Sequence, residues 1–357
     1  MEESDDVIDK QLISDFMKRH EVDGLFIQKD ENLRYISGFT GSDSYLFIAE
    51  DGYFLLTDSR YVEQAKKEAA GFTVVDYKGK LAETVGELVS RTGVNVLGIE
   101  TILSYKMYLS LEEVLSEISL EFCPVDDFRR IKTEKELELI AEACRISDEG
   151  FRNTIPYIKA GVTERYLQAV LECEMLKAGS EGKSFDTIVA SGERGAYPHG
   201  TATDKVIEEG ELITFDFGAI YHGYHSDITR TVAVGEISDR QRFLYDKVLG
   251  CNEYVESLLK AGIHANEADR AAREYLKQFE LDSYFTHALG HSVGLEIHES
   301  PVLALRDTSL LEANMTETVE PGVYLPGTGG ARIEDTVVIK QNGIAILTQF
   351  PKKFLKV

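Results

Sequence analysis

The sequence predicts two domains of different class: an α/β domain over residues 1–125, with a mixed sheet and helices, and an α+β domain over residues 126–357. The chain has 357 residues, which is long for one compact core. Short helical and strand patterns alternate in the first third of the chain, whereas four longer helices and many strands follow it. A proline and two aspartates at residues 124–127 mark the expected boundary.

The first domain is expected to begin with an amphipathic helix, because apolar residues recur at helical spacing over residues 7–17. Asp58 and Arg60 directly follow an expected strand, and we expect them to form a buried ion pair, for which a structural and a functional role both stay open. The remaining pattern predicts strands at 24–28, 45–49, 53–57, 72–76 and 94–99, the second and third forming a hairpin, and helices at 61–70, 81–91 and 105–118.

The second domain is expected to open with a long helix. Thr133 and Glu136 have the spacing of a capping box, and apolar residues then recur at helical spacing to about residue 158. Further helices are expected at 163–176, 239–261 and 266–279, with the remaining strands between and after them.

Composition limits the classes of partner. The chain has 38 Lys and Arg against 62 Asp and Glu, a formal charge of −24, which argues against nucleic acids and anionic membranes. No apolar run approaches the ~18 residues of a membrane span, and the acidic N-terminus lacks a signal-type apolar core. The four cysteines are scattered and form no C-x-x-C pair, so they are expected to be reduced, mostly buried thiols. We therefore expect a cytoplasmic protein.

Two aspartates stand where a strand pattern disfavours them. Asp216 lies inside the apolar run 212–217, and Asp227 opens the next strand-like run. If the two runs pair antiparallel, both carboxylates can reach one face, where one would take up a proton unless a divalent metal or a pair of metals binds them. Taken singly, either aspartate is equally explained by a bulge or a turn.

Further side chains that can bind metals follow downstream. His287 and His291 stand four apart in His-Ala-Leu-Gly-His, but Gly290 breaks a helix there, so a loop leading into a strand is expected. Glu320 and Glu334 each lie beside an expected strand. Each residue alone fits a loop or turn role. As an ordered set, two Asp, two Glu and at least one His suit Mn, Co, Fe or Zn in a two-metal site and outnumber the three ligands of a single catalytic zinc.

This ordered set resembles the metal ligands of the pita-bread metallopeptidases, which include methionine aminopeptidases, Xaa-Pro aminopeptidases and Xaa-Pro dipeptidases. The resemblance covers the whole second domain and implies a curved antiparallel sheet flanked by helices. The first domain resembles the N-terminal domain of creatinase and the proline-specific members, which favours that branch. The resemblance implies two divalent metal ions per subunit, with Mn or Co favoured over Zn or Fe, and with Asp227 and Glu334 bridging them. The implied ligands are Asp216, Asp227, His291, Glu320 and Glu334.

The resemblance also implies roles for residues near the metals. His199, in Ala-Tyr-Pro-His-Gly, would face the substrate and, with His298, stabilise the developing oxyanion. Glu320 would carry a proton from the nucleophile to the leaving nitrogen. The alternative for each of these histidines, and for His287, Tyr324 and Arg332, is simple hydrogen bonding that orients a metal ligand. Substrate binding is expected of His287, Tyr324 and Arg332, the last near the substrate carboxyl or peptide end. The resemblance implies that His287 and His298 hold the proline side and stabilise the tetrahedral intermediate, and that His298, Tyr324 and Arg332 form the pocket for the proline ring.

The implied function is hydrolysis of the Xaa–Pro bond, in dipeptides or at peptide N-termini, by a hydroxide activated between two metals. The implied partners are small peptides with proline at the second position and a second copy of the chain in a homodimer. A metal-free creatinase-like hydrolase and a non-catalytic binding module of the same fold are the alternatives. Both lose metal ligands in that family, whereas all five positions are intact here. The sequence leaves dipeptidase and aminopeptidase open, because it does not show how a substrate carboxylate would be recognised.

Overall fold

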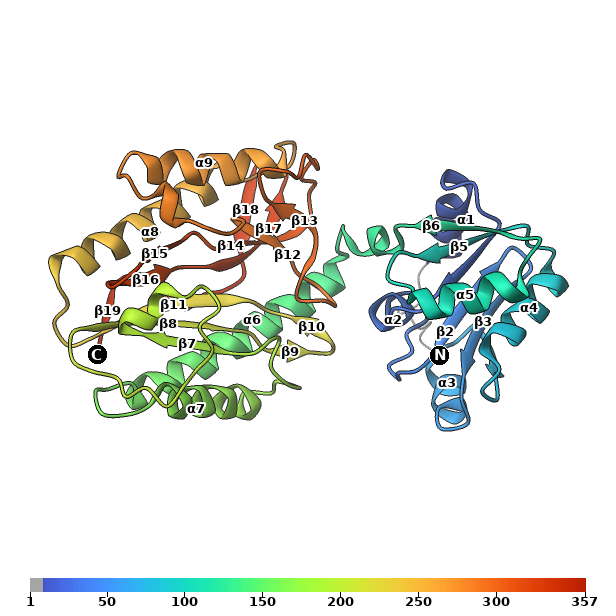
Figure 1. Ribbon diagram of the computed structural model, residues 1–357, viewed down its shortest axis with the longest axis horizontal. Helices are drawn as coiled ribbons and strands as arrows, with labels where there is room; N and C mark the ends of the chain where they lie inside the picture. Colours follow the sequence, from blue (N-terminus) through green and yellow to red (C-terminus); the bar gives the residue numbers. More distant parts are fainter. Residues whose placement is uncertain (1–8) are drawn as a thin grey trace. The chain divides into compact units, whose positions relative to one another are not determined.

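The computed structural model describes residues 9–357, so the start of the first expected helix, at residues 7–8, lies outside the described residues. The chain forms two compact units that divide between Phe128 and Arg129. Helices and strands alternate in the first unit, and longer helices and short strands make up the second (Figure 1). No helix within residues 9–357 has both the length and the apolarity needed to cross a membrane.

Unit 1 alternates helices and strands as its sequence pattern predicts, and it contains a further helix at residues 30–37 and a further strand at residues 119–123 that the pattern did not predict. In chain order its elements are α1 (Lys10–Arg19), β1 (Gly24–Ile27), α2 (Asp30–Ser37), β2 (Tyr45–Ala49), β3 (Gly52–Thr57), α3 (Val62–Glu68), β4 (Thr73–Asp76), α4 (Leu81–Thr92), β5 (Val96–Glu100), α5 (Tyr105–Val114), β6 (Ser119–Cys123) and the 3₁₀ helix η1 (Val125–Arg129), whose last residue belongs to unit 2.

The described strands of unit 1 form one mixed sheet in the order β4-β3-β2-β1-β5-β6. β2 pairs antiparallel with both β1 and β3, which confirms the expected hairpin, and the outer pairs are parallel. Side chains alternate across β1: Leu25 and Ile27 pack with α1, α2 and α3, whereas Phe26 packs with α4 and α5. Burial on both faces explains why this strand is a continuous apolar run.

Unit 2 contains four long helices and many short strands. In chain order its elements are α6 (Glu134–Thr154), η2 (Ile155–Tyr157), α7 (Glu164–Lys177), β7 (Ile188–Ser191), η3 (Gly192–Ala196), β8 (Glu211–Phe217), β9 (Ile220–Tyr221), β10 (Tyr224–His225), β11 (Ile228–Val234), α8 (Asp239–Leu258), α9 (Ala265–Lys277), η4 (Asp282–Tyr284), β12 (Gly290–Ser292), β13 (Glu299–Leu303), β14 (Thr316–Val319), β15 (Gly322–Leu325), β16 (Gly329–Arg332), β17 (Asp335–Lys340), β18 (Gly343–Ile346) and β19 (Leu355–Lys356).

The strands of unit 2 fall into two sets, and each set packs on its own pair of helices. The sheet β19-β11-β8-β7 packs on α6 and α7 around Phe151, Phe215 and Phe217. Strands β14, β15 and β17 pack on α8 and α9 in a second apolar core. A bridge between Thr229 and Glu334 joins the two sets, so the strands lie between the helix pairs (Figure 1). This arrangement is the pita-bread architecture that the resemblance to the pita-bread metallopeptidases implies.

Several local expectations need correction. Helix α5 ends at Val114 and not at 118, and α8 ends at Leu258 and not at 261. Asp58 and Arg60 do form an ion pair, with Nη2 to Oδ2 at 2.6 Å, but the Arg60 side chain is 62% exposed, so the expectation of a buried pair was wrong. Its guanidinium also reaches Asp43 in solvent, where such pairs contribute little to stability.

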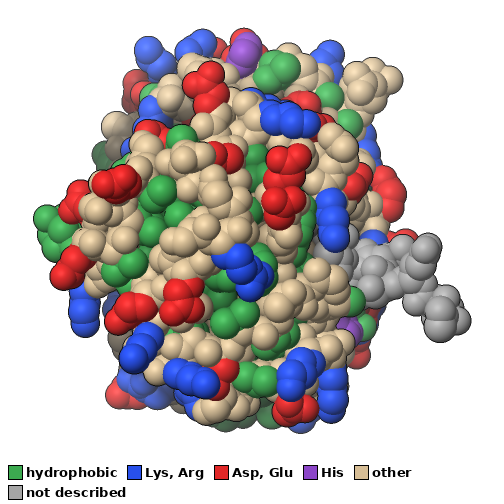
Figure 2. Space-filling model, turned by 90° about the vertical axis from the view of Figure 1, so that its right-hand side faces the viewer, with side chains coloured by type: hydrophobic (Ala, Val, Ile, Leu, Met, Phe, Trp, Pro, Cys, Tyr) green, Lys and Arg blue, Asp and Glu red, His purple; other side chains and the backbone are tan. Residues whose placement is uncertain are grey.

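The long helix α6, expected to run to about residue 158, ends at Thr154 and is followed by η2. Two other local expectations agree with the structure. The capping box of Thr133 and Glu136 is formed at the start of α6. Cys123, Cys144 and Cys251 are free and buried, and Cys173 is free and exposed. On the face shown in Figure 2, acidic and basic side chains are interspersed with hydrophobic ones.

Candidate metal centre and active site

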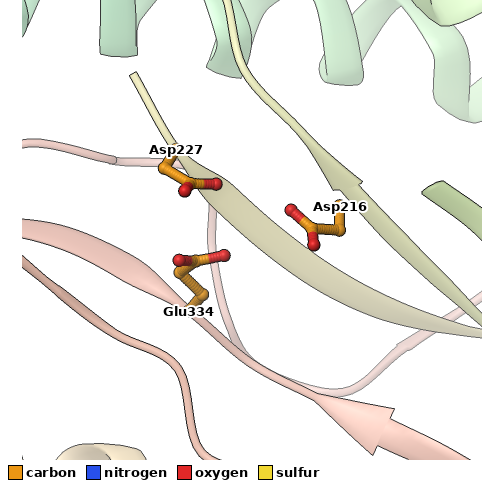
Figure 3. Close-up of side chains that lie close together, drawn as sticks. All are labelled: Asp216, Asp227 and Glu334. Atoms are coloured by element: carbon orange, nitrogen blue, oxygen red, sulfur yellow. The ribbon is translucent and has the colours of Figure 1, made fainter. Parts of the chain in front are cut away.

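Asp216 and Asp227 are brought together by the antiparallel pairing of β8 with β11. Asp216 lies opposite Thr229 in this register, and Asp227 directly precedes β11. The small strands β9 and β10 form the connection between the two aspartates. Both side chains are buried, and a carboxylate oxygen from each lies within 4.8 Å of one from Glu334 (Figure 3). The two strands do pair antiparallel, which is the condition under which the sequence predicts a carboxylate cluster.

Glu334 reaches this cluster because the backbone between β16 and β17 is bonded to β11. The Glu334 amide donates to the Thr229 carbonyl at 3.1 Å. The Thr229 hydroxyl donates to Glu334 Oε2 at 2.7 Å, which fixes one carboxylate oxygen. The other oxygen, Oε1, is buried and has no hydrogen-bond partner. Thr229 was not singled out by the sequence, because a threonine in a strand gives no signal of a special role.

His291 and Glu320 complete the group of five. His291 Nε2 lies 3.5 Å from Asp227 Oδ2 and 3.6 Å from Glu320 Oε1. The Nδ1 atom of His291 lies 3.1 Å from the carbonyl of Ser292, to which it can donate. The lone pair of Nε2 then points toward the carboxylates, as a metal-binding imidazole requires. Strand β12 carries His291, and Glu320 follows β14, so the expectation of a loop entering a strand at His291 is confirmed.

The electrostatics of the five residues favour a bound cation. Burial, followed by repulsion from neighbouring carboxylates, raises the pKa of Asp227 and of Glu334 well above its ordinary value. Burial also raises the pKa of Glu320 to about 8, although Arg332 opposes the shift, and burial lowers the pKa of His291 to about 4. A low pKa keeps the imidazole neutral and free to bind a metal, and divalent cations would offset the repulsion among the carboxylates.

Unpaired oxygen atoms test whether metals fit this site. Asp216 Oδ1, Asp227 Oδ1 and Glu334 Oε1 are each buried without a hydrogen-bond partner. Buried carboxylate oxygens without partners cost free energy unless a cation binds them. Four carboxylates and one imidazole form a donor set of hard oxygens and one nitrogen, which suits divalent transition metals. The residues present therefore fit a dinuclear metal centre.

All ten side chains that the sequence predicted for the site line one cavity of about 460 Å³. Nine further residues line the cavity, and most of them are apolar. They could not be identified from the sequence, because an apolar residue that lines a cavity has the same sequence pattern as one that packs in the hydrophobic core. The ten predicted residues are His199, Asp216, Asp227, His287, His291, His298, Glu320, Tyr324, Arg332 and Glu334. The further lining residues are Phe185, Asp186, Ile188, Pro198, Thr201, Ala288, Gly290, Ile297 and Val302.

Three of these side chains form a chain of hydrogen bonds along the cavity wall. Arg332 Nη1 donates to the Tyr324 hydroxyl at 2.8 Å, and the same hydroxyl lies 2.8 Å from His287 Nε2. His287 Nδ1 lies 2.7 Å from the carbonyl of Ala288, so it donates there and Nε2 accepts from Tyr324. Burial lowers the pKa of His287 to about 4, consistent with a neutral ring. Arg332 Nη2 also donates to Asp216 Oδ2 at 2.6 Å and orients that carboxylate.

The two remaining histidines lie at the open side of the cavity. His298 directly precedes β13, and its ring packs edge-on against that of His291 with the centroids 4.4 Å apart. His199 lies in the loop that follows η3. Both side chains line the cavity and are exposed, so both can meet a bound molecule.

A buried carboxylate cluster with one imidazole, set in an open cavity between two layers of strands, defines a metal-dependent hydrolase of the pita-bread class. The chain belongs to metallopeptidase family M24, whose pattern matches residues 138–341. The pattern of the creatinase/prolidase N-terminal domain matches residues 11–131.

Relatives of known name extend over nearly the whole chain. An Xaa-Pro dipeptidase of Pyrococcus furiosus is 41% identical over 345 residues, which is 95% of this chain and 97% of that protein. Among solved structures, an Xaa-Pro dipeptidase from Bacillus anthracis is similar with a TM-score of 0.93 and 41% identity over 98% of each chain. An X-Pro aminopeptidase from Thermotoga maritima is similar with a TM-score of 0.88 and 39% identity, over 96% of this chain and 100% of that one.

Proposed function

We propose that this protein is a proline-specific metallo-exopeptidase that hydrolyses the Xaa–Pro bond of dipeptides or of peptide N-termini. The observation that carries the proposal is the meeting of Asp216, Asp227, His291, Glu320 and Glu334 in one cavity of about 460 Å³. A cavity of this volume has the size of small-ligand sites in general. The relatives named Xaa-Pro dipeptidase and X-Pro aminopeptidase supply the substrate class.

The five residues would hold two divalent metal ions, with Mn or Co favoured and Zn or Fe as further candidates. Asp227 and Glu334 would be among the ligands, since each has a buried carboxylate oxygen without a hydrogen-bond partner. When bound, such a pair polarises the carbonyl of the scissile bond and lowers the pKa of the attacking water. Thr229 holds one oxygen of Glu334 and Arg332 holds one oxygen of Asp216, which leaves the partnerless oxygens of both carboxylates for the metals.

The other side chains of the cavity would act directly on the substrate. Glu320 would accept the proton of the attacking water and deliver it to the proline nitrogen, which has no hydrogen of its own. His199 and His298 would donate hydrogen bonds to the oxygen of the tetrahedral intermediate. The wall formed by His287, Tyr324 and Arg332 would receive the proline side of the substrate.

The proposal also includes the division into domains, the cellular compartment and the oligomeric state. Residues 126–357 would form the catalytic domain and residues 1–125 its creatinase/prolidase-like partner domain. The protein would work in the cytoplasm, where its four free cysteines remain reduced. It would act as a homodimer, which sedimentation or light scattering can test.

Replacing Asp227 with Ala tests the proposal. The Asp227→Ala protein should retain less metal by elemental analysis and should lose hydrolysis of Xaa-Pro peptides, because one of the five ligand side chains is missing. Asp246→Ala is the matched control, since Asp246 is an exposed partner of Arg242 on α8. Full peptidase activity in the Asp227→Ala protein would refute the two-metal site.

A further inference from the structure

The cavity contains one arginine and no lysine among the described residues that line it, and this limits how a substrate carboxylate could be bound. A free Xaa-Pro dipeptide carries its carboxylate directly on the proline, next to the bond that is cut. A longer peptide carries an amide at that position and places its carboxylate further away. Bringing a carboxylate into a partly enclosed site is costly unless a cation or several donors receive it.

Arg332 is occupied by the protein itself. A guanidinium group has five N–H donors, and four of those of Arg332 are used. Nε donates to the Thr229 hydroxyl, Nη1 to the Pro198 carbonyl and the Tyr324 hydroxyl, and Nη2 to Asp216 Oδ2 at 2.6 Å. The residue is also 3% exposed. Its charge is therefore paired with the Asp216 carboxylate and is not available to a substrate.

The neighbours of Arg332 offer no substitute. The Tyr324 hydroxyl and both ring nitrogens of His287 are engaged in the hydrogen-bond chain that ends at the Ala288 carbonyl. In the proposed function, His199 and His298 are assigned to the oxygen of the reacting carbonyl. The remaining wall is largely apolar and includes Phe185, Ile188, Ile297 and Val302.

The one other charged group on the lining is an acid. Besides the five predicted ligands and Arg332, Asp186 is the single charged residue among the described residues that line the cavity. Its side chain is 79% exposed and pairs with Lys183, which is 42% exposed, at 2.9 Å. Solvent-exposed pairs of this kind neutralise each other weakly. A substrate carboxylate at the mouth of the cavity would therefore meet a group of its own sign.

We propose that this site selects peptides that continue beyond proline, Xaa-Pro-Yaa and longer, over free Xaa-Pro dipeptides. The inference rests on the proposed function and chooses between the two substrate classes that the function leaves open. The recognised feature is the neutral carbonyl on the far side of proline, which an apolar wall accepts without a counter-ion.

Three substrates with the same first residue test this selection on the metal-loaded, full-length protein: Ala-Pro, Ala-Pro amide and Ala-Pro-Ala. The amide differs from the dipeptide by little more than its charge. We expect kcat/KM for the amide and the tripeptide to exceed that for Ala-Pro by about tenfold or more, the factor that ~1.4 kcal/mol corresponds to. Equal or faster hydrolysis of Ala-Pro would overturn the inference and leave the proposed function intact. Hydrolysis of none of the three would refute the proposed function itself.

Asp186→Lys provides a second test, because it places a cation on the lining at an exposed position where folding is not at risk. The variant should lower KM for Ala-Pro and move the ratio of amide to dipeptide turnover toward one. Asp204→Lys is the matched control: Asp204 also forms an exposed ion pair, with Arg165 at 2.9 Å, and does not line the cavity. An unchanged ratio in Asp186→Lys, or the same change in Asp204→Lys, would count against carboxylate exclusion by this wall.

Discussion

Glu320 combines two properties that a proton-carrying side chain needs. Its Oε1 lies 3.6 Å from His291 Nε2, at the edge of the carboxylate cluster, and it faces the cavity. Burial raises its pKa from 4.5 to about 8. A group with a pKa near the working pH can both accept and release a proton. Bound metals would lower this pKa again, since nearby positive charge favours the carboxylate.

The raised pKa of Glu320 predicts how the stability of the metal-free protein depends on pH. The folded state keeps a proton that the unfolded state releases, so this contribution to the free energy of unfolding is complete below pH 4.5 and is lost as the pH rises through about 8. Glu320→Gln cannot titrate. We expect urea unfolding of the metal-free, chelator-treated proteins to show that the free energy of unfolding of wild type falls between pH 5 and pH 8 by on the order of a few kcal/mol more than that of the variant. A difference independent of pH would contradict the raised pKa.

Thr229 acts on the site through its hydroxyl group alone. Its hydroxyl donates to Glu334 Oε2 at 2.7 Å and accepts from Arg332 Nε at 3.1 Å. Thr229→Val preserves the shape of the side chain but removes both bonds. We expect the affinity for Mn²⁺ or Co²⁺ to fall by about 10–100-fold, as for other groups that orient metal ligands. Titration calorimetry measures this, and Thr229→Ser, which keeps the hydroxyl, should bind nearly as wild type does.

At the scale of elements, the features that can be predicted from the sequence are those in which a buried side chain would cost free energy unless a partner, such as a cation, were bound to it. Asp216 in a strand was recognisable because a buried carboxylate there requires a cation, whereas the pairing of β8 with β11 was only a condition of that interpretation until the structure showed it. Thr229 was not recognisable, because threonine is favourable in any strand. The exposure of Arg60 was not recognisable either, since burial depends on neighbours from distant segments.

A buried cluster of charges fixes the segment that carries His298. The Glu299 carboxylate accepts hydrogen bonds from Arg129 Nη1 at 2.7 Å and from Lys132 Nζ at 3.0 Å, and all three side chains are 5% exposed or less. Arg129 also pairs with Glu296. His298 directly precedes Glu299. The cluster therefore ties the start of β13 to the residues that precede α6.

Removing the Glu299 carboxylate from this cluster should lower the free energy of unfolding. Glu299→Ala leaves the Arg129 and Lys132 charges without their shared carboxylate, and breaking a buried pair in this way typically costs about 3–5 kcal/mol. Glu142→Ala is the control, because Glu142 pairs with Arg145 on the exposed face of α6 and should cost about 0–1 kcal/mol. Urea unfolding measures the loss in free energy of unfolding for both variants. Equal losses would show that burial of the cluster does not increase its contribution to stability.

At the scale of the whole molecule, the proposed metal site lies where the two strand sets of unit 2 meet. Asp216 and Asp227 lie on the side of β8 and β11, whereas His291, Glu320 and Glu334 come from the strands β12 to β17. Without metals the carboxylates of the two sets repel one another, whereas bound metals would let the same groups hold the sets together. All five residues belong to unit 2, so metal binding should stabilise that unit selectively.

Hydrogen exchange with and without a chelator tests this selectivity. A metal that binds only the folded state stabilises it by about 2.7 kcal/mol at a free concentration 100 times its Kd, which slows exchange through unfolding about a hundredfold. Amides of β8, β11 and β17 should show this protection, because these strands carry or flank the ligands. Amides of β1 to β3 in unit 1 should exchange at the same rate in both conditions. A uniform gain across the chain would mean that the two units unfold together, and no gain in β8 and β11 would mean that the metals do not bind between the strand sets.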